Sequence, residues 1–276
     1  MTALSLETDA PRRRAAPLAG FARGAAGAVL PLSLVIVWEG LSRAGLIAAN
    51  VLPSPSAVLA AGIETARSGE LARNMWVSAA RAFAGLAVGG AIGFALGVLN
   101  GVSETASRYA DTTLQMARNV PHLALIPLVI LWFGIGEESK LFLVALGVFF
   151  PLYINTLHGV RSVDPQLVEM GRAYGMSRLE LFRTAILPGA LPSVFVGLRF
   201  ALGVMWLTLI VAETISAESG IGHMAMQARE FLRTDVVVLA IVIYALLGKG
   251  ADVATRALEG LFLRWRPEFQ REQEFK

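Results

Sequence analysis

The sequence predicts an all-α polytopic membrane protein with six transmembrane helices. Of its 276 residues, 55% are hydrophobic and only 16% are charged, whereas a soluble domain carries about 25% charged residues. The chain has no cysteine. This composition excludes a disordered chain, a disulfide-linked scaffold and an ordinary cytosolic enzyme. Stretches free of Asp, Glu, Lys and Arg then give the six spans, at 24–38, 82–103, 119–136, 141–160, 200–212 and 236–248.

The last two of these stretches are short for a bilayer, which needs about 20 apolar residues. They become long enough if Arg199 and Lys249 lie near the interface and extend their charges to water. With six spans and the N-terminus in the cytoplasm, the cytoplasmic segments hold sixteen of the 24 Lys and Arg residues, against seven outside. The positive-inside rule therefore favours cytoplasmic N- and C-termini.

The spans divide the chain into three parts. We expect a cytoplasmic lead at 1–23, a six-helix transmembrane domain at 24–258 with a cytoplasmic loop at 161–188, and a cytoplasmic tail at 259–276. The basic residues follow this topology and form no nucleic-acid patch. The first span is interpreted as an uncleaved helix; a signal peptide is the alternative. Residues 56–81 are expected to form an amphipathic helix on the outer surface.

The second span carries a row of glycines at four-residue spacing, which allows another backbone to approach closely. The row is compatible with the interface of a dimer and with a contact inside one helix bundle. The contact inside the bundle is favoured, because each four-residue step turns the row by about 40° around the helix, so it does not stay on one face. The row comprises Gly85, Gly89, Gly93, Gly97 and Gly101.

Motifs for catalysis and for nucleotide binding are absent from the sequence. A phosphate-binding loop ends in Gly-Lys-Ser or Gly-Lys-Thr, and no lysine of this chain follows that pattern. The three histidines lie far apart in the sequence, so we expect no metal site. No catalytic residue is assigned, and the chain is not expected to be an enzyme.

The 161–188 loop predicts two short helices outside the membrane. Asp164 and Pro165 are typical of a helix start, and Gly175 is typical of a helix end in the left-handed conformation. A second helix from near Ser177 is expected to run to a break at Pro188. The first helix should present an apolar knob to the cytoplasm, and a soluble partner should cover it. The knob consists of Leu167, Met170 and Tyr174.

The same loop resembles the membrane subunits of ATP-binding-cassette importers. Their cytoplasmic signature is Glu-Ala-Ala, three residues, Gly, nine residues, Ile, one residue and Leu-Pro. Glu169, Gly175, Leu187 and Pro188 match this signature at its spacings. Met170 and Gly171 replace the two alanines, and Ala185 replaces the isoleucine, so small or apolar character is kept. The resemblance implies that the loop docks on an ATPase subunit through Asp164, Leu167, Glu169, Met170, Gly171, Ala173, Tyr174, Gly175, Leu187 and Pro188.

Residues 116–135 and 191–249 narrow the resemblance to permeases of aliphatic sulfonate importers. Related permeases serve taurine, nitrate, cyanate and pyrimidine precursors, and these substrates stay open as alternatives. The resemblance implies a type I importer fold in the bacterial inner membrane and a homodimer of this chain. It also implies two copies of an ATPase subunit, which carry ATP and Mg²⁺, and a periplasmic solute-binding protein. The chain itself is expected to contact lipid and to bind no cofactor.

Two groups of residues are candidates for the translocation pathway. Arg199, Trp206 and Glu213 recur every seven residues, so they lie within about 40° of one helix face. Asn119 and His122 open the third span beside a proline, where a kink or a cavity is typical. Arg199 could stop an anionic headgroup, or it could be an interfacial anchor. There are two rival classes of protein. One is an ATP-independent channel or secondary transporter, which would need charges in mid-span, and the other is a membrane anchor.

Overall fold

The computed structural model describes residues 18–263 and 265, and within them every regular element is a helix. In chain order the elements are α1 (Leu18–Arg43), α2 (Pro55–Arg67), α3 (Glu70–Val102), α4 (Glu104–Ala117), η1 (His122–Leu125), α5 (Ile126–Phe133), α6 (Glu137–Arg161), α7 (Pro165–Ala173), α8 (Arg178–Leu181), η2 (Phe182–Ile186), α9 (Leu187–Ser216), α10 (Ile221–Glu230) and α11 (Thr234–Phe262). Residues 1–17 of the expected 1–23 lead and most of the expected 259–276 tail lie outside the described residues.

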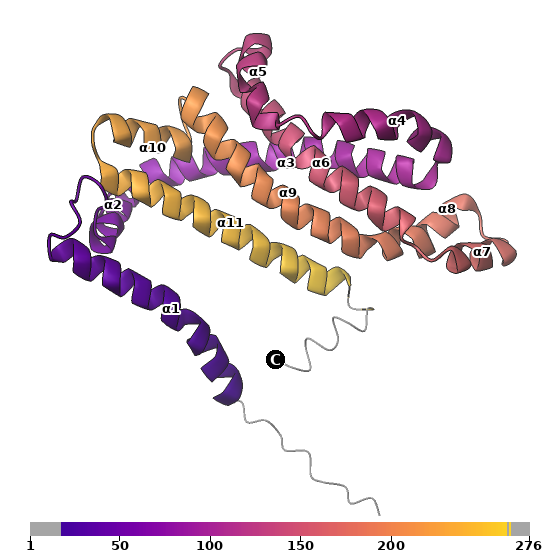
Figure 1. Ribbon diagram of the computed structural model, residues 1–276, viewed down its shortest axis with the longest axis horizontal. Helices are drawn as coiled ribbons and strands as arrows, with labels where there is room; N and C mark the ends of the chain where they lie inside the picture. The colour runs from indigo at the N-terminus through magenta and orange to yellow at the C-terminus, as the bar shows by residue number, and fades with distance from the viewer. Residues whose placement is uncertain (1–17, 264, 266–276) are drawn as a thin grey trace, which may run out of the picture.

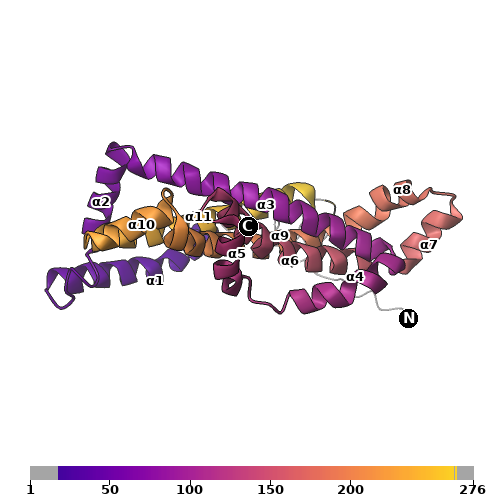
Figure 2. The ribbon, with the colours of Figure 1, turned by 90° about the horizontal axis from the view of Figure 1, so that it is seen from above.

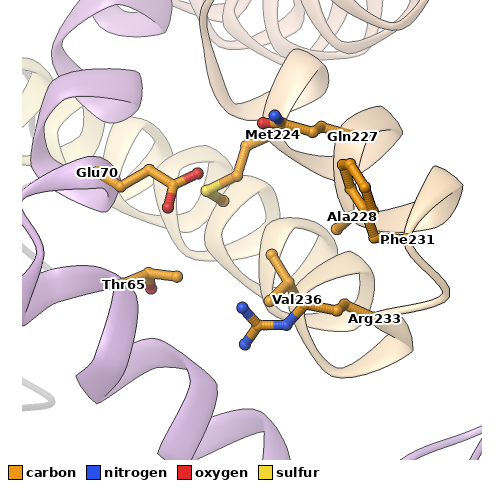
Figure 3. A pocket seen from close by; sticks show the side chains of 8 residues that line it. All are labelled: Thr65, Glu70, Met224, Gln227, Ala228, Phe231, Arg233 and Val236. Atoms are coloured by element: carbon orange, nitrogen blue, oxygen red, sulfur yellow. The ribbon is translucent and has the colours of Figure 1, made fainter.

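Four long helices run side by side along the molecule. They are α3, α6, α9 and α11, and α6 lies between α3 and α9 (Figure 1). The short helices α7 and α8 lie at one end of this bundle, which we call the α7 end. Helices α2 and α10 lie at the opposite end, which we call the α10 end (Figure 2). At the α10 end, residues of α2, α3, α10, α11 and the connection between α10 and α11 line a pocket of about 190 Å³, among them Glu70 and Arg233 (Figure 3). The two ends are therefore separate surfaces of the same bundle.

The glycine row of α3 allows α6 to pack against it at very short range. A Cβ atom at Gly93 would lie 2.6 Å from the Phe149 carbonyl oxygen, and one at Gly97 would lie 2.8 Å from that of Tyr153. A Cβ at Gly89 would overlap the Ala145 backbone. Since helix backbones this close leave no room for side chains, the spacing brings α3 and α6 together within one chain. Gly85 and Gly101, the ends of the row, also face α6, where the side chains of Val144 and Val160 occupy the space.

Apolar spans are present as expected, but fewer than the six predicted: among the described residues there are four, or five if one bent helix pair counts as a span. Among the described residues, α3, α6, the continuous 178–215 helix and α11 are each long and apolar enough to cross a membrane. The predicted 119–136 span is not one straight helix. The 122–133 segment bends by 78° from α4, and the two together form at most one broken span. The prolines at 121 and 127 account for the break, because each lacks a backbone N–H.

Two helix boundaries also differ from the expected ones. The predicted amphipathic helix at 56–81 is interrupted at Gly69, whose φ of +77° is left-handed, so residues 70–81 open α3 instead. The predicted break at Pro188 is absent as well. The chain passes through the π-helical turn η2 directly into α9, and this irregular turn just before Pro188 accommodates the missing N–H of the proline. The loop is thus joined to α9 as one continuous helix.

Candidate functional site

The 164–175 segment is a short helix whose ends are satisfied locally. The Asp164 carboxylate accepts a hydrogen bond of 2.8 Å from the Gln166 N–H, and Pro165 occupies the first helical turn. Gly175 follows the helix with φ of +78°, a conformation that suits glycine. Ser177 and Glu180 then form a reciprocal capping box that starts α8. The segment therefore holds its shape through its own turns.

The apolar side chains of this segment point into solvent. Leu167 is 48% exposed, Met170 is 52% exposed and Tyr174 is 79% exposed. Glu169, Ala173 and Gly175 are exposed too, whereas Gly171 is buried where α8 crosses α7. Leu187 and Pro188 are half-buried at the start of α9. The α7 end thus carries an exposed apolar knob on a well-formed helix, joined rigidly to a long bundle helix.

A second polar centre lies inside the bundle, around the carboxylate of Glu213. Ser78 donates to both carboxylate oxygens at 2.8 Å, and Arg81 donates to one at 2.8 Å. The Tyr244 hydroxyl and the Gly222 N–H each donate at 2.9 Å. We call Ser78, Arg81, Glu213 and Tyr244 the buried ion cluster, because the exposure of each residue is 8% or less.

Arg81 also links the buried ion cluster to α6 and to the connection between α9 and α10. Its guanidinium forms a bidentate pair with Glu137 of α6, at 2.5 and 2.6 Å, and donates at 2.6 Å to the Ser219 carbonyl. Lys140 lies 3.2 Å from the same Glu137 carboxylate. Bidentate geometry uses the planar fork of arginine, which lysine lacks. Arg81 therefore ties α3 to α6 and to the connection between α9 and α10.

The first turn of α10 is held by side chains of α3. Asn74 accepts a hydrogen bond of 3.0 Å from the Gly220 N–H, and Ser78 accepts one of 2.9 Å from the Ile221 N–H. The first N–H groups of a helix have no partner within the helix. Here α3 supplies two partners and Glu213 of α9 accepts from the Gly222 N–H, so α10 is fixed in place on the bundle.

The three residues of the seven-residue repeat in α9 have different surroundings. Trp206 is buried and packs edge-on against Phe83 and Tyr244. Glu213 belongs to the buried ion cluster. Arg199 is the thirteenth residue of the α9 range rather than near its end, and it pairs with Glu259 and, at 3.7 Å, with Asp252 of α11. The charge of Arg199 is therefore balanced by α11 in this conformation.

The two candidates of the third span lie on the bent segment. The His122 Nε2 atom is 2.9 Å from the Thr208 hydroxyl of α9, and His122 is half-buried. Asn119 is exposed, and its side-chain amide donates at 3.1 Å to the Gln115 carbonyl. Of the two, the structure brings His122 alone against α9.

Comparisons with known proteins assign the chain to a family. Residues 89–262 match the model of the family described as "Binding-protein-dependent transport system inner membrane component". The chain belongs to this family. This permease is 57% identical to the putative aliphatic sulfonates transport permease protein SsuC of Escherichia coli strain K12, over 87% of the chain and 91% of that protein. It is 42% identical to the putative SsuC of Bacillus subtilis strain 168, over 88% of each.

More distant relatives share the fold or the family. The permease is 36% identical to the taurine transport system permease protein TauC of E. coli, over 86% of the chain and 88% of TauC. An inward-facing crystal structure of the MetNI methionine ABC transporter aligns with a TM-score of 0.54 and 21% identity. The alignment covers 68% of the permease and 95% of that chain. The predicted fold class of an ABC importer permease is confirmed, and the protein is a multi-pass membrane permease.

Sequence reasoning missed most of the buried ion cluster. The sequence identifies Glu213 as a candidate and does not by itself predict that Arg81 pairs with it inside the permease. A signal was present: Asn74, Ser78 and Arg81 recur every three or four residues on one face of a helix. Among the described residues, no group of three His, Cys, Asp or Glu side chains could hold a metal ion.

Proposed function

We propose that this permease forms the translocation pathway for aliphatic sulfonates in an ATP-driven importer. Its membership of a binding-protein-dependent transport family makes an ATPase subunit and a solute-binding protein its partners. The observation that carries the mechanism is the apolar knob of α7, because a soluble surface rarely leaves such side chains in water without a partner. ATP hydrolysis belongs to the ATPase subunit, so this chain is not itself an enzyme.

The assembly that we propose has two copies of this permease and two ATPase subunits. The α7 end faces the cytoplasm with both termini, and the α10 end faces the binding protein. Closure of the ATPase dimer moves α7, and the continuous helix from α8 through η2 to α9 carries this motion into the bundle. The central pathway then changes between outward and inward access, a two-state equilibrium that nucleotide shifts.

The sulfonate substrate is supported by the two SsuC relatives. Taurine is the second candidate, because TauC is 36% identical and is named for taurine transport. Nitrate, cyanate and pyrimidine precursors stay as further alternatives. An ATP-independent channel or secondary transporter is disfavoured, because the buried Glu213 carboxylate is fully hydrogen-bonded to fixed partners and has no open coordination position for a coupling ion.

Of the five pathway candidates, Arg199, Asn119 and His122 are proposed to line the pathway, whereas Trp206 and Glu213 are buried within the bundle. Arg199 can offer its guanidinium to a sulfonate only if its pairs with Asp252 and Glu259 open during transport. Replacing Arg199 with Gln should therefore lower sulfonate uptake several-fold and leave the assembled complex intact. Unchanged uptake would remove Arg199 from the pathway.

The test of the proposal uses the complex of permease, ATPase subunit and binding protein in vesicles. Uptake of a labelled alkanesulfonate should require ATP inside the cytoplasmic compartment, and taurine and nitrate serve as competitors. Met170→Lys places a charge in the apolar knob and should abolish copurification of the ATPase subunit. Leu46→Lys is the matched control, because Leu46 is 74% exposed and lies in the loop that joins α1 to α2. If Met170→Lys binds ATPase and transports normally, α7 is not the docking site.

A further inference from the structure

The α7 end contains a groove that the proposed mechanism does not use. It lies between the last turns of α3 and the α7–α8–η2 segment, and its volume is about 910 Å³. This is comparable with small-ligand pockets, which measure roughly 300–1,000 Å³. The volume alone identifies no ligand, so the chemistry of the lining decides what the groove can hold.

The lining combines an apolar floor with two positive charges. Val98 and Val102 of α3 face Phe182 and Ile186 across the groove, and Arg172 and Arg178 line it from α7 and α8. None of the described lining residues is acidic. Neither arginine forms an ion pair with a carboxylate within the described part of the chain. The groove therefore suits a ligand with an apolar body and an anionic head.

Arg172 is separate from the knob that we assign to the ATPase subunit. At 100° per residue, Arg172 lies about 160° from Met170 and Tyr174 around α7. A partner that covers the knob therefore leaves the guanidinium of Arg172 on the opposite face of α7. The groove and the knob are two surfaces of the same short helix.

The apolar floor continues into an exposed apolar surface of α3, a helix long and apolar enough to cross a membrane. Val102 is 51% exposed and its neighbour Leu99 is 50% exposed, both at the end of a membrane-spanning helix. An acyl chain can therefore enter along α3 while its headgroup stays level with α7. Anionic headgroups at the cytoplasmic leaflet attract basic residues, and each Lys or Arg near the surface contributes to this attraction.

We propose that this groove binds one anionic phospholipid of the cytoplasmic leaflet. Arg172 and Arg178 hold the headgroup phosphate, and Val98, Val102, Phe182 and Ile186 hold the first part of an acyl chain. The inference rests on the proposed function, because it requires the α7 end to face the cytoplasm. The lipid joins α3 to the segment that moves with the ATPase, so it would stabilise the resting position of α7 and α8.

The experiment titrates the purified permease–ATPase complex with dioleoyl-phosphatidylglycerol or dioleoyl-phosphatidylcholine and counts bound lipid by native mass spectrometry. We expect phosphatidylglycerol to bind at least tenfold more tightly than phosphatidylcholine. Arg172→Gln and Arg178→Gln should each weaken phosphatidylglycerol binding about fivefold and leave phosphatidylcholine unchanged. Arg183→Gln is the matched control, because Arg183 is exposed on the same segment and does not line the groove.

A second variant tests the apolar floor without touching the arginines. Val102→Trp should fill the groove and reduce phosphatidylglycerol binding at least fivefold, whereas excess inorganic phosphate should not displace the lipid. Equal binding of the two lipids, or no difference between the groove variants and Arg183→Gln, would overturn the proposal. Loss of the ATPase subunit from Arg172→Gln with its lipid retained would also overturn it, and would assign the groove to ATPase contact. Sulfonate uptake is measured separately. A complex that fails the lipid tests but still takes up sulfonate with ATP overturns the lipid site alone and leaves the proposed function intact.

Discussion

The α7 end exposes apolar side chains, whereas the buried ion cluster buries charged ones. At the α7 end, apolar side chains stand in water, while the helix ends are satisfied by residues within the same loop. In the buried ion cluster, charges are buried and satisfied by partners from α3, α9, α10 and α11. The hydrogen bonds of the α7 end form within its own loop, and its apolar knob is left exposed. The hydrogen bonds of the buried ion cluster form only when the helices of the bundle pack together. A partner can bind the α7 end without disturbing the buried ion cluster.

Removing one charge of the buried ion cluster should have the largest effect on stability. Glu213→Gln leaves the Arg81 guanidinium buried with one carboxylate fewer, and breaking a buried pair costs about 3–5 kcal/mol. Thermal unfolding of the purified permease measures this loss of stability. Glu218→Gln is the control, because Glu218 is exposed in the loop before α10. A Glu213→Gln permease as stable as the control would show that the cluster is not a structural centre.

The glycine row should give the next largest effect. Gly89→Val would force α3 away from the Ala145 backbone, and such overpacking costs about 1–3 kcal/mol. Gly203→Val adds the same side chain to α9, where no atom lies within 4 Å of the added Cβ. We expect a lower unfolding temperature for the first variant alone. Similar unfolding temperatures for both would contradict the close packing of α3 on α6.

Gly175→Val tests whether strain at the α7 end affects transport specifically. The φ of +78° is unfavourable for a β-branched residue, and the local cost is about 1–3 kcal/mol. Gly45→Val imposes similar strain, because Gly45 has a φ of +74° and equally open surroundings. We expect Gly175→Val alone to uncouple ATP hydrolysis from uptake in vesicles with loaded binding protein. If the two variants transport and hydrolyse alike, α7 does not transmit motion.

The smallest expected effect comes from a single helix cap. Ser177→Ala removes the side-chain oxygen that accepts the Glu180 N–H, and losing such a cap costs about 1 kcal/mol. Ser54→Ala removes the equivalent cap of α2 at the α10 end. Amide hydrogen exchange should become faster in α8 for the first variant and in α2 for the second. Slower ATPase stimulation is expected for Ser177→Ala alone, and an equal slowing in both would remove the link between the cap and coupling.

The sequence by itself determined features that depend on neighbouring residues. Hydropathy located the apolar spans, because a bilayer selects length and composition directly. The caps of α7 and the turn at Gly175 followed from residue types, because these hydrogen bonds and dihedral angles are local. The four-residue spacing of the α3 glycines indicated a close helix contact, and it left open which helix would provide it.

Only the tertiary structure decided how distant residues meet. Arg81 and Glu213 are far apart in the sequence, and each alone resembles an interfacial charge. The packing of α3 against α9 buries both side chains and pairs them. Likewise, the sequence leaves Arg199 either as a site for an anionic headgroup or as an interfacial anchor, and only the packing of α11 places Asp252 and Glu259 beside it. The physical reason is that a buried charge depends on partners from other helices, and hydropathy along one segment carries no information about those partners.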